Sequence, residues 1–167
     1  MDKIKFIIEK LDLKPHPEGG YFRETYRSAG VIMPESLGQD YHGKRNFATG
    51  IYFLLTSNAF SAFHRIKQDE MWHFYDGSPL ELHILSEAGK YSVQILGREL
   101  NDGQVPQMVI HGGNWFAATV VDANSFTLTG CTVSPGFDFT DFELARREEM
   151  ISRFPQHRKV ITKLTRG

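Results

Sequence analysis

The sequence lacks the features typical of disulfide-bonded proteins, of nucleic-acid-binding proteins, and of membrane or secreted proteins. It holds one cysteine, Cys131, so no disulfide can form within the chain. Nineteen Lys and Arg residues against twenty Asp and Glu residues give a formal net charge of −1, so no basic excess attracts a phosphate backbone. No apolar run approaches the ~20 residues of a membrane span, and residues 6–8 are too short a run for a secretion signal. We therefore expect a cytoplasmic protein that binds neither nucleic acid nor membrane.

The composition is typical of one folded domain. Hydrophobic residues make up 41% of the 167 residues and charged residues 23%, which is the balance of a soluble globular chain. A domain of this length buries roughly 70% of its unfolded surface, enough for a core without disulfide or metal support. No internal repeat or low-complexity stretch marks a boundary. Residues 1–167 are therefore predicted to form a single domain.

Short segments of strand-forming residues fill the middle of the chain, with Gly, Pro or Asn turns between them. No gap is long enough for a crossover helix, so the strands are predicted to pair antiparallel, in a jelly roll or similar double-sheet barrel. Residues 28–43 are predicted to be a long loop. The predicted strands are Tyr21–Arg27, Thr49–Thr56, Ser61–Arg65, Glu70–Tyr75, Leu80–Leu85, Tyr91–Leu96, Gln107–Ile110, Phe116–Val121 and Phe126–Val133.

Helices are predicted only at the two ends of this all-β chain. Apolar residues recur with helical spacing over residues 2–12, and Asp2 is a plausible cap. Apolar residues also lie among charges over residues 141–154, and Pro155 is suited to open a last helix.

Two consecutive predicted strands contain His and Glu residues at the spacing of a known sequence motif. The segment Ala62–Gly77, AFHRIKQDEMWHFYDG, resembles the first motif of the cupin superfamily, with His64 and Glu70 at the places of its first histidine and its glutamate. Ile66 stands where that motif has a second histidine. In the partial match to the second motif, Phe116 stands in the histidine position.

Five blocks, in order, resemble an uncharacterised cupin subgroup along nearly the whole chain. The resemblance implies a double-stranded antiparallel β-helix, which is the jelly-roll barrel that cupins share with nucleotide-sugar epimerases. It also implies a pocket in the barrel mouth and a homodimer. The blocks are HPEGGYFRETYRS, TGIYFLL, FHRIKQDEMWHFYDG, GNWFAA and TVSPGFDFTDFELA.

The ligand set expected of a metal-dependent cupin is incomplete. The resemblance implies three histidines and a carboxylate, of which His64 and Glu70 remain, whereas most catalytic sites use at least three protein ligands. His73 would need a bulge to join Glu70, because strand side chains alternate. His83 could face the same pocket, but its apolar neighbours Leu82 and Ile84 are also candidates for the inward face of that strand. We therefore predict a pocket without metal or cofactor, and keep a metal-dependent oxygenase or isomerase as an alternative.

Without a metal, His64 and Glu70 form a polar pair inside an apolar barrel. Burial raises the pKa of a carboxyl and lowers that of an imidazole, and pairing opposes both shifts, so either outcome leaves a proton donor or acceptor near neutrality. Together with the resemblance to the nucleotide-sugar epimerase fold, this pattern favours an isomerase or epimerase acting on a sugar or sugar-nucleotide-like molecule, with His64 as base and Glu70 as acid or tuning group. One alternative is a non-catalytic module that binds a small molecule. Another is a buried pair left from a lost metal site.

Further residues are candidates for ligand binding. Aromatic side chains on the strands offer stacking surfaces for a planar or sugar ring, although such residues more often fill cores. Arg23 is suited to clamp an anionic group, or else to form a surface ion pair with Glu24 or another acid. His16, by contrast, is predicted to be solvated, as are His42 and His157, and Cys131 to pack as a small apolar residue. The candidate ligand-binding residues are Arg23, Tyr52, Trp72, Phe74, His83 and Phe116.

Overall fold

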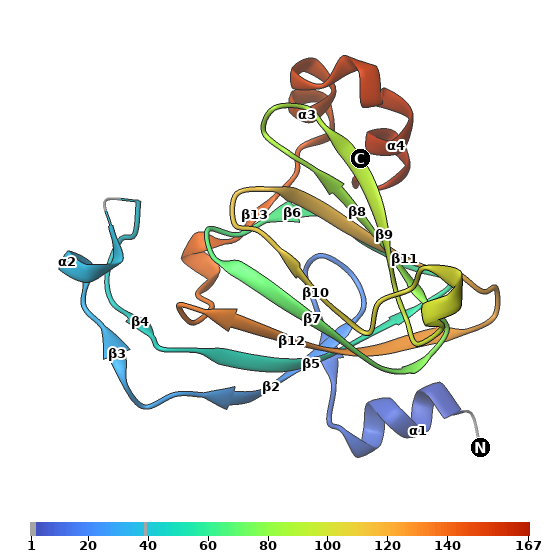
Figure 1. Ribbon diagram of the computed structural model, residues 1–167, viewed down its shortest axis with the longest axis horizontal. Coiled ribbons are helices and arrows are strands. Elements are labelled where there is room, and N and C mark those ends of the chain that lie inside the picture. The colour runs from blue at the N-terminus through green and yellow to red at the C-terminus, as the bar shows by residue number, and fades with distance from the viewer. Residues whose placement is uncertain (1–2, 39) are drawn as a thin grey trace.

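A computed structural model describes residues 3–38 and 40–167 and shows two antiparallel sheets facing each other (Figure 1). The first sheet has the order β1-β2-β5-β12-β7-β10, and the second has the order β13-β6-β11-β8-β9. Their bounds are β1 Lys14–Pro15, β2 Tyr21–Arg27, β5 Thr49–Thr56, β12 Phe126–Ser134, β7 Asp69–Gly77, β10 Gln107–Ile110, β13 Glu143–Leu144, β6 Phe60–Arg65, β11 Trp115–Val120, β8 Leu80–Leu85 and β9 Tyr91–Leu96.

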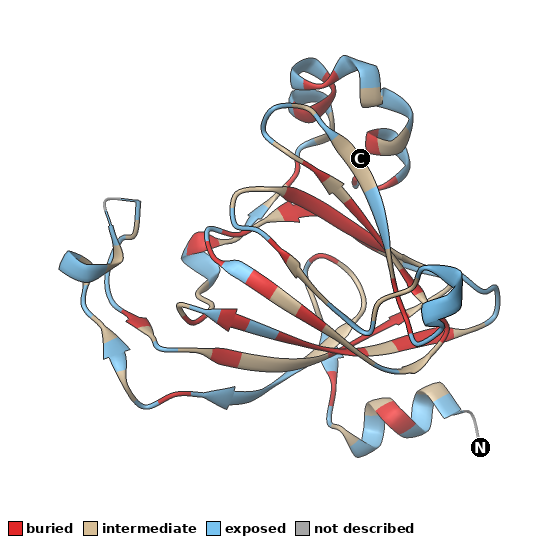
Figure 2. Ribbon diagram, viewed as in Figure 1, coloured by how far each residue is buried: buried red, intermediate tan, exposed pale blue. Residues whose placement is uncertain are grey.

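The architecture confirms the predicted mostly β jelly roll with short terminal helices. Each predicted strand is present with its ends within two residues of the prediction, and all pairs of named strands in the described residues are antiparallel. The barrel core lies between the sheets and includes Phe53, Trp72 and Phe116. In Figure 2 the buried positions follow the strands of both sheets. The two sheets therefore share one interior.

Helices cover the outer faces of the two sheets. Helix α1, Lys3–Lys10, places Ile7 with Leu54 and Phe126 of the first sheet. Helices α3, Arg147–Arg153, and α4, Arg158–Lys163, pack on the second sheet, where Met150 and Ile161 cluster with Trp115 and Leu85. Single-turn 3₁₀ helices lie at η1 Leu100–Asp102, η2 Phe139–Asp141 and η3 Pro155–His157. The predicted cap Asp2 lies outside the described residues.

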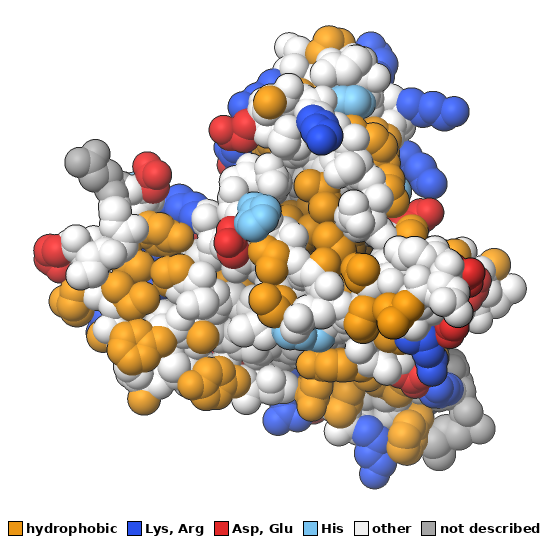
Figure 3. Space-filling model, in the orientation of Figure 1, with side chains coloured by type: hydrophobic (Ala, Val, Ile, Leu, Met, Phe, Trp, Pro, Cys, Tyr) orange, Lys and Arg blue, Asp and Glu red, His pale blue; other side chains and the backbone are white. Residues whose placement is uncertain are grey.

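The segment predicted as a long loop contains regular structure. Strand β3, Val31–Ile32, pairs with β4, Arg45–Asn46, and the one-turn helix α2, Pro34–Leu37, lies between them. These elements form an arm beside the barrel, at the left of Figure 1. Met33 and Phe47 on this arm are 53% exposed, and hydrophobic side chains gather over it in Figure 3. The breaker-rich composition of residues 28–43 concealed the two-residue strand β3 and the one-turn helix α2, whereas β4 lies just after the predicted loop.

Within the described residues, no helix combines the length and the apolarity that crossing a membrane requires.

Candidate functional site

A cavity of ≈ 300 Å³ lies inside the barrel. Residues on strands β2, β5, β7 and β12 of the first sheet line its floor. From the second sheet, His64 on β6 lines the cavity. The turn at residues 16–20 and the segment 137–142, which we call the cover segment, complete its wall. The lining therefore comes from residues far apart in the sequence.

The structure brings the two predicted catalytic residues to this one cavity. Glu70 and Trp72 are buried on β7, whereas Met71 and His73 between and after them are less buried, as strand alternation requires. His64 is 3% exposed and also lines the cavity. His73 lies outside the lining, where its Nε2 contacts Thr132 Oγ1 at 3.2 Å.

His64 uses both of its ring nitrogens in contacts with the protein. Its Nδ1 lies 2.7 Å from the carbonyl oxygen of Ala62, which can only accept, so Nδ1 carries a hydrogen. Its Nε2 lies 2.8 Å from Oε2 of Glu18, in a pair whose side chains are 3% and 7% exposed. Burial lowers the pKa of His64, but the Glu18 carboxylate outweighs burial, and the net shift is upward. His64 is therefore the imidazolium of a buried ion pair.

Glu18 is the carboxylate of this pair and was not a predicted site residue. Burial raises the pKa of Glu18. The charge of His64 and the hydrogen bond between the two side chains lower the pKa by more than burial raises it, so the net shift is downward. Ser61 Oγ donates to Glu18 Oε1 at 2.9 Å. The sequence offered one indication of this role, since Glu18 lies in the HPEGG block of the subgroup resemblance.

A turn with two glycines holds Glu18 over the cavity. His16 N donates to Gly20 O and Gly19 N donates to His16 O, both at 3.0 Å. Gly19 has φ of 119° and Gly20 has φ of 74°, in the left-handed region that favours glycine. A Cβ on Gly19 would lie 2.3 Å from the carbonyl oxygen of Phe60. Other residues at position 19 would therefore displace the turn.

The prediction that His16 is solvated was wrong. Its side chain is 8% exposed and lines the cavity, because the turn folds its ring edge-on against Phe22, with centroids 4.6 Å apart. The backbone N–H of Glu18 donates to Nδ1 of His16 at 3.3 Å. Burial lowers the pKa of His16, so the ring is neutral and carries its hydrogen on Nε2.

Glu70 is a titratable group of the cavity whose pKa lies near neutrality. Its pKa is raised from 4.5 to about 7, chiefly by burial and also by the negative charge of Glu18. His64 opposes it, as do the Cys131 thiol and the Trp72 indole near the carboxyl. Cys131 is buried as predicted and also lines the cavity. Burial raises the pKa of its thiol well above the ordinary value, so this cysteine stays protonated.

The Trp72 indole lies beside Glu70, and its N–H helps to lower the pKa of that carboxyl. The indole is 1% exposed and lines the cavity. Its Nε1 forms no hydrogen bond of acceptable geometry within the described residues. A buried N–H without a partner costs on the order of 1–3 kcal/mol, so an acceptor on a bound molecule would offset a real penalty.

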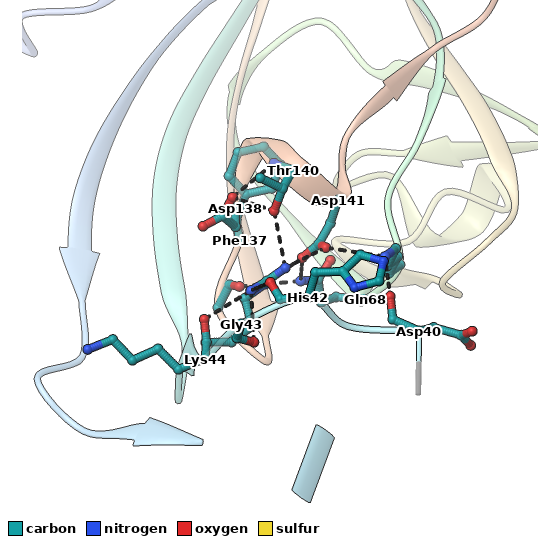
Figure 4. Close-up of polar contacts among 12 residues, drawn as sticks. Asp40, His42, Gly43, Lys44, Gln68, Phe137, Asp138, Thr140 and Asp141 are labelled. Carbon is teal, nitrogen blue, oxygen red and sulfur yellow. Dashed lines mark hydrogen bonds and ion pairs between the residues drawn. The ribbon is translucent and has the colours of Figure 1, made fainter. Parts of the chain in front are cut away.

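The cover segment is anchored by a buried ion pair. Arg45 on β4 donates from Nε and Nη2 to the two oxygens of Asp141, both at 2.7 Å. Figure 4 shows the polar contacts around Asp141, with Gln68 and Thr140 labelled beside it. The two side chains are 3% and 0% exposed. Gln68 Nε2 donates to the same carboxylate at 2.7 Å, and Asp138 Oδ1 accepts from Thr140 N at 2.9 Å. These contacts hold Phe139 and Phe142 at the cavity.

Asp141 is the first residue of the segment 141–154, in which apolar residues lie among charges, but no C-terminal α-helix begins at it. Residues 139–141 form the single turn η2, and α3 begins only at Arg147. Burial raises the pKa of Asp141, but its hydrogen bonds to Arg45 and Gln68 outweigh burial and lower it. Nothing in the local pattern distinguished Arg45, which lies 96 residues away in sequence.

Two charged side chains mark the exposed rim of the cavity. Arg27 donates from Nε to Glu24 Oε1 at 2.9 Å and from Nη2 to Glu24 Oε2 at 2.7 Å. Strand β2 shifts register between Glu24 and Tyr26, and this bulge lets Arg27 line the same cavity as Glu24. Glu24 is therefore paired with Arg27 and not with Arg23. Lys14 lowers the pKa of the exposed Asp12 carboxyl and the charge of Arg23 adds to this, so Arg23 interacts with another acid at the surface.

Three of the predicted ligand-binding residues lie on outer faces of the sheets. Arg23 Nη1 donates to the carbonyl oxygen of Leu11 at 3.2 Å. Tyr52 packs in the cluster under α1, with its ring 6.2 Å from that of Tyr75. His83 contacts Tyr91 Oη at 2.7 Å and Thr119 Oγ1 at 3.0 Å. None of the three lines the cavity, so we assign them no role in it.

Two other predicted residues lie in the barrel core behind the cavity. The Phe116 ring lies 4.1 Å from that of His64, at an interplanar angle of 57°. Phe74 shares the inward face with Trp72 but packs against the core away from the lining. Of the six predicted ligand-binding residues, Trp72 alone lines the cavity.

The donor set does not fit a metal ion. Ile66 and Phe116 carry no donor atom at two of the positions where metal-dependent cupins hold histidines, and both nitrogens of His64 are engaged. In residues 3–38 and 40–167, no group of three or more His, Cys, Asp and Glu side chains is arranged to hold one. We therefore derive no step through a metal.

Comparisons with known proteins give the family. Protein SO0799 of Shewanella oneidensis is 37% identical, with a TM-score of 0.89 over 99% of both chains. A hypothetical protein from Leishmania major is 33% identical, with a TM-score of 0.89 over 98% of both chains. The uncharacterized protein YML079W of Saccharomyces cerevisiae is 29% identical over 155 residues, 87% of this chain and 77% of its own length. A family model described as cupin superfamily, DUF985, matches residues 5–145, and the chain belongs to this family.

Proposed function

We propose that the protein binds a small polar metabolite in the barrel cavity and catalyses a metal-independent isomerisation by proton transfer. The observation that carries this proposal is the Glu70 carboxyl. It lies in the cavity wall, is 8% exposed and has a pKa of about 7. A general acid or base is most effective when its pKa lies near the working pH.

The reaction needs no group from outside the protein. Glu70 as carboxylate takes a proton from a carbon beside a carbonyl, and the C–H electron pair is delocalised onto the carbonyl oxygen as an enolate. The Glu70 carboxylic acid then returns the proton to that carbon or to another position of the conjugated system. Nothing is oxidised or reduced overall.

Two N–H groups are available to the enolate oxygen. Trp72 Nε1 has no partner in the described residues, and His16 carries its hydrogen on Nε2 because Nδ1 accepts from Glu18 N. Donors fixed before the reaction stabilise an oxyanion more than water does, since they need no reorientation. Binding of a carbonyl oxygen would also satisfy the buried indole.

His64 takes a different role from the predicted base. Its nitrogens contact Ala62 O and Glu18 Oε2, so neither is available to a substrate. Its positive charge lowers the pKa of Glu70 and so favours the reactive carboxylate. In this proposal His64 and Glu18 are positioning residues, and Glu70 is the catalytic residue.

The test is isotope exchange in D₂O. The protein is incubated with a panel of sugars, hydroxyketones and keto acids, and deuterium at carbon is followed by proton NMR. We expect at least one compound to exchange, at a rate reduced by about 10²-fold or more in Glu70→Gln. No exchange across the panel, or equal exchange by the variant, contradicts the proposal. A compound that binds both proteins equally and never exchanges would favour the non-catalytic binding module.

A further inference from the structure

Four phenylalanine rings surround the imidazole of His16 at the cavity. The Phe22 ring meets it edge-on with centroids 4.6 Å apart, and the Phe139 ring is stacked with it at 6.1 Å and an interplanar angle of 27°. The Phe53 and Phe142 rings lie at 6.3 Å and 6.0 Å, both edge-on. All five rings line the cavity. A molecule that reaches this imidazole must therefore place apolar surface against the phenylalanine rings.

The imidazole supplies a hydrogen-bond donor to this aromatic wall. Nδ1 of His16 accepts from Glu18 N, so the hydrogen of the neutral ring lies on Nε2. In residues 3–38 and 40–167, Nε2 has no acceptor. A buried N–H group without an acceptor is unfavourable, so an acceptor atom on a bound molecule stabilises the complex. A carbonyl oxygen on an apolar carbon skeleton fits both the donor and the rings.

Aliphatic side chains form much of the remaining wall. Ile51 on β5 and Val133 on β12 line the cavity from the first sheet, and Ile66 lines it just after β6. The hydroxyl of Thr49 accepts from Phe137 N at 2.9 Å. A sugar carries a hydroxyl on nearly every carbon, and each hydroxyl that leaves water without gaining a partner weakens binding. A molecule with few oxygen atoms therefore matches this wall better than a sugar does.

The strongest ion pairs of the wall leave no cation free for an anionic ligand. His64 contacts Ala62 O and Glu18 through its two nitrogens. Arg27 donates from Nε and Nη2 to the two carboxylate oxygens of Glu24. Arginine binds a phosphate or carboxylate strongly through two parallel N–H groups, and Glu24 already occupies these two. The wall therefore favours a neutral molecule over an anion.

We propose that the cavity selects a neutral aryl carbonyl compound, with its aromatic ring among the phenylalanine rings around His16 and its carbonyl oxygen accepting from His16 Nε2. Aromatic rings in edge-on or offset contact gain more than the area they bury provides. This inference rests on the proposed function, since it names the substrate class of that proton-transfer site. An aryl hydroxyketone offers the carbonyl to His16 and, on the next carbon, a C–H bond to Glu70. The binding preference itself is measurable without turnover.

The first test compares three carbonyl compounds. In α-hydroxyacetophenone a phenyl ring is joined to a hydroxyketone, erythrulose carries the same hydroxyketone on a hydroxylated chain, and benzoylformate keeps the phenyl carbonyl but adds a carboxylate. Binding to the full chain is measured by NMR titration. We expect α-hydroxyacetophenone to bind at least about tenfold tighter than either of the others. Undetectable binding of this compound, or equal affinity for one of the others, overturns the inference.

The donor is tested with His16→Phe, which keeps a flat ring among the phenylalanines and removes the N–H group. We expect α-hydroxyacetophenone to bind this variant about tenfold more weakly. Phenethyl alcohol has the ring and the hydroxyl but no carbonyl, so its affinity should stay within about twofold of that for the wild type. Unchanged binding of α-hydroxyacetophenone would show that His16 donates nothing to it.

The aromatic wall is tested at a ring whose loss leaves the core intact. Phe139 is 52% exposed, and Phe139→Leu should weaken binding of α-hydroxyacetophenone about fivefold. Phe6→Leu makes the same change on α1, at a ring that does not line the cavity, and should bind as the wild type does. Equal affinities of the two variants contradict the proposed place of the aromatic ring.

Deuterium exchange separates this inference from the proposed function. If sugars exchange with dependence on Glu70 and α-hydroxyacetophenone does not bind, proton transfer stands and the aromatic selection fails. If α-hydroxyacetophenone binds with the expected preference and no compound exchanges, the selection stands and proton transfer fails.

Discussion

The Nε2 atom of His64 lies 2.8 Å from Oε2 of Glu18, a contact that joins strand β6 to the turn at residues 16–20. Because Nδ1 of the same ring donates to Ala62 O, the imidazolium is fully engaged by the protein. The charged pair therefore supports the cavity wall and sets the electrostatics that Glu70 experiences. Proton chemistry falls to Glu70.

Removal of the Glu18 charge should destabilise the fold. Glu18→Gln leaves a buried imidazolium without its counter-charge, and breaking a buried ion pair costs about 3–5 kcal/mol. We expect a loss of that order in urea unfolding at pH 6, with a fall in the pKa of His64 followed by NMR. Glu9→Gln removes an exposed carboxylate 3.9 Å from Lys5 and should change stability by less than about 0.5 kcal/mol. Equal stability of the two variants would disprove this view of the pair.

The His64–Glu18 pair should stabilise the folded state fully only within a limited pH range. The pKa of His64 is raised from 6.5, so its contribution is complete below 6.5 and is lost as pH rises through the folded-state value. The pKa of Glu18 is lowered from 4.5, so its contribution is complete above 4.5 and is lost as pH falls through the folded-state value. The pair should therefore stabilise the fold most between these two limits, which unfolding of wild type and Glu18→Gln across pH will test.

Glu70 should make the fold less stable as pH rises. Its pKa is raised from 4.5 to about 7, so the folded state binds the proton more tightly than the unfolded state does. Between these values stability falls with pH, by up to about 3 kcal/mol for this group. In Glu70→Gln that contribution is absent. The stability of the variant relative to the wild type should therefore increase as pH rises from 5 to 8. Parallel pH profiles of the two proteins would refute the raised pKa.

The Arg45–Asp141 pair should control the cover segment. Arg45→Met leaves the Asp141 carboxylate buried without its bidentate partner, which should cost about 3 kcal/mol and speed hydrogen exchange over residues 137–142. A double variant, Arg45→Met with Asp141→Leu, removes both charges and should recover at least half of the stability. Unchanged exchange in the single variant would show that other contacts hold the segment.

The turn that carries His16 and Glu18 should tolerate no side chain at Gly19. A Cβ there meets Phe60 O at 2.3 Å, and the φ of 119° is itself unfavourable for other residues. Gly19→Ala should therefore destabilise the protein by about 2 kcal/mol or more and shift the ring resonances of His16. Gly103 also has a positive φ, of 75°, but a Cβ there meets nothing within 4 Å. Gly103→Ala should cost about 1 kcal/mol and leave His16 unaffected.

The barrel could be predicted well from the sequence, because the alternation of side chains along each strand can be seen within a few consecutive residues. Alternation along β7 places Glu70 and Trp72 on one face, and the same rule places His73 on the other. On β8 the apolar residues Leu82 and Ile84 take the inward face, which leaves His83, a candidate ligand-binding residue in the sequence, on the outer one. Strand periodicity therefore suffices to sort most side chains between core and surface.

The parts of the site that the sequence did not reveal depend on contacts between distant segments. His16 looked solvated beside two prolines, yet its turn folds over the barrel interior and buries it. Arg45 and Asp141 lie 96 residues apart, and no local pattern links them. The bulge between Glu24 and Tyr26 brings Arg27, in place of Tyr26, to the cavity side of β2, and a single-residue register change of this kind leaves little trace in composition.

The titration of Glu70 tests the account most directly. Uniformly ¹³C-labelled protein is titrated from pH 4 to 9 while the side-chain carboxyl carbons of glutamate are followed by NMR, and Glu70→Gln identifies the resonance. We expect one carboxyl resonance that titrates at about 7 in the wild type and is absent from the variant. Titration of the Glu70 resonance near 4.5, the ordinary value for a glutamate, would contradict it and remove the basis for proton transfer in this cavity.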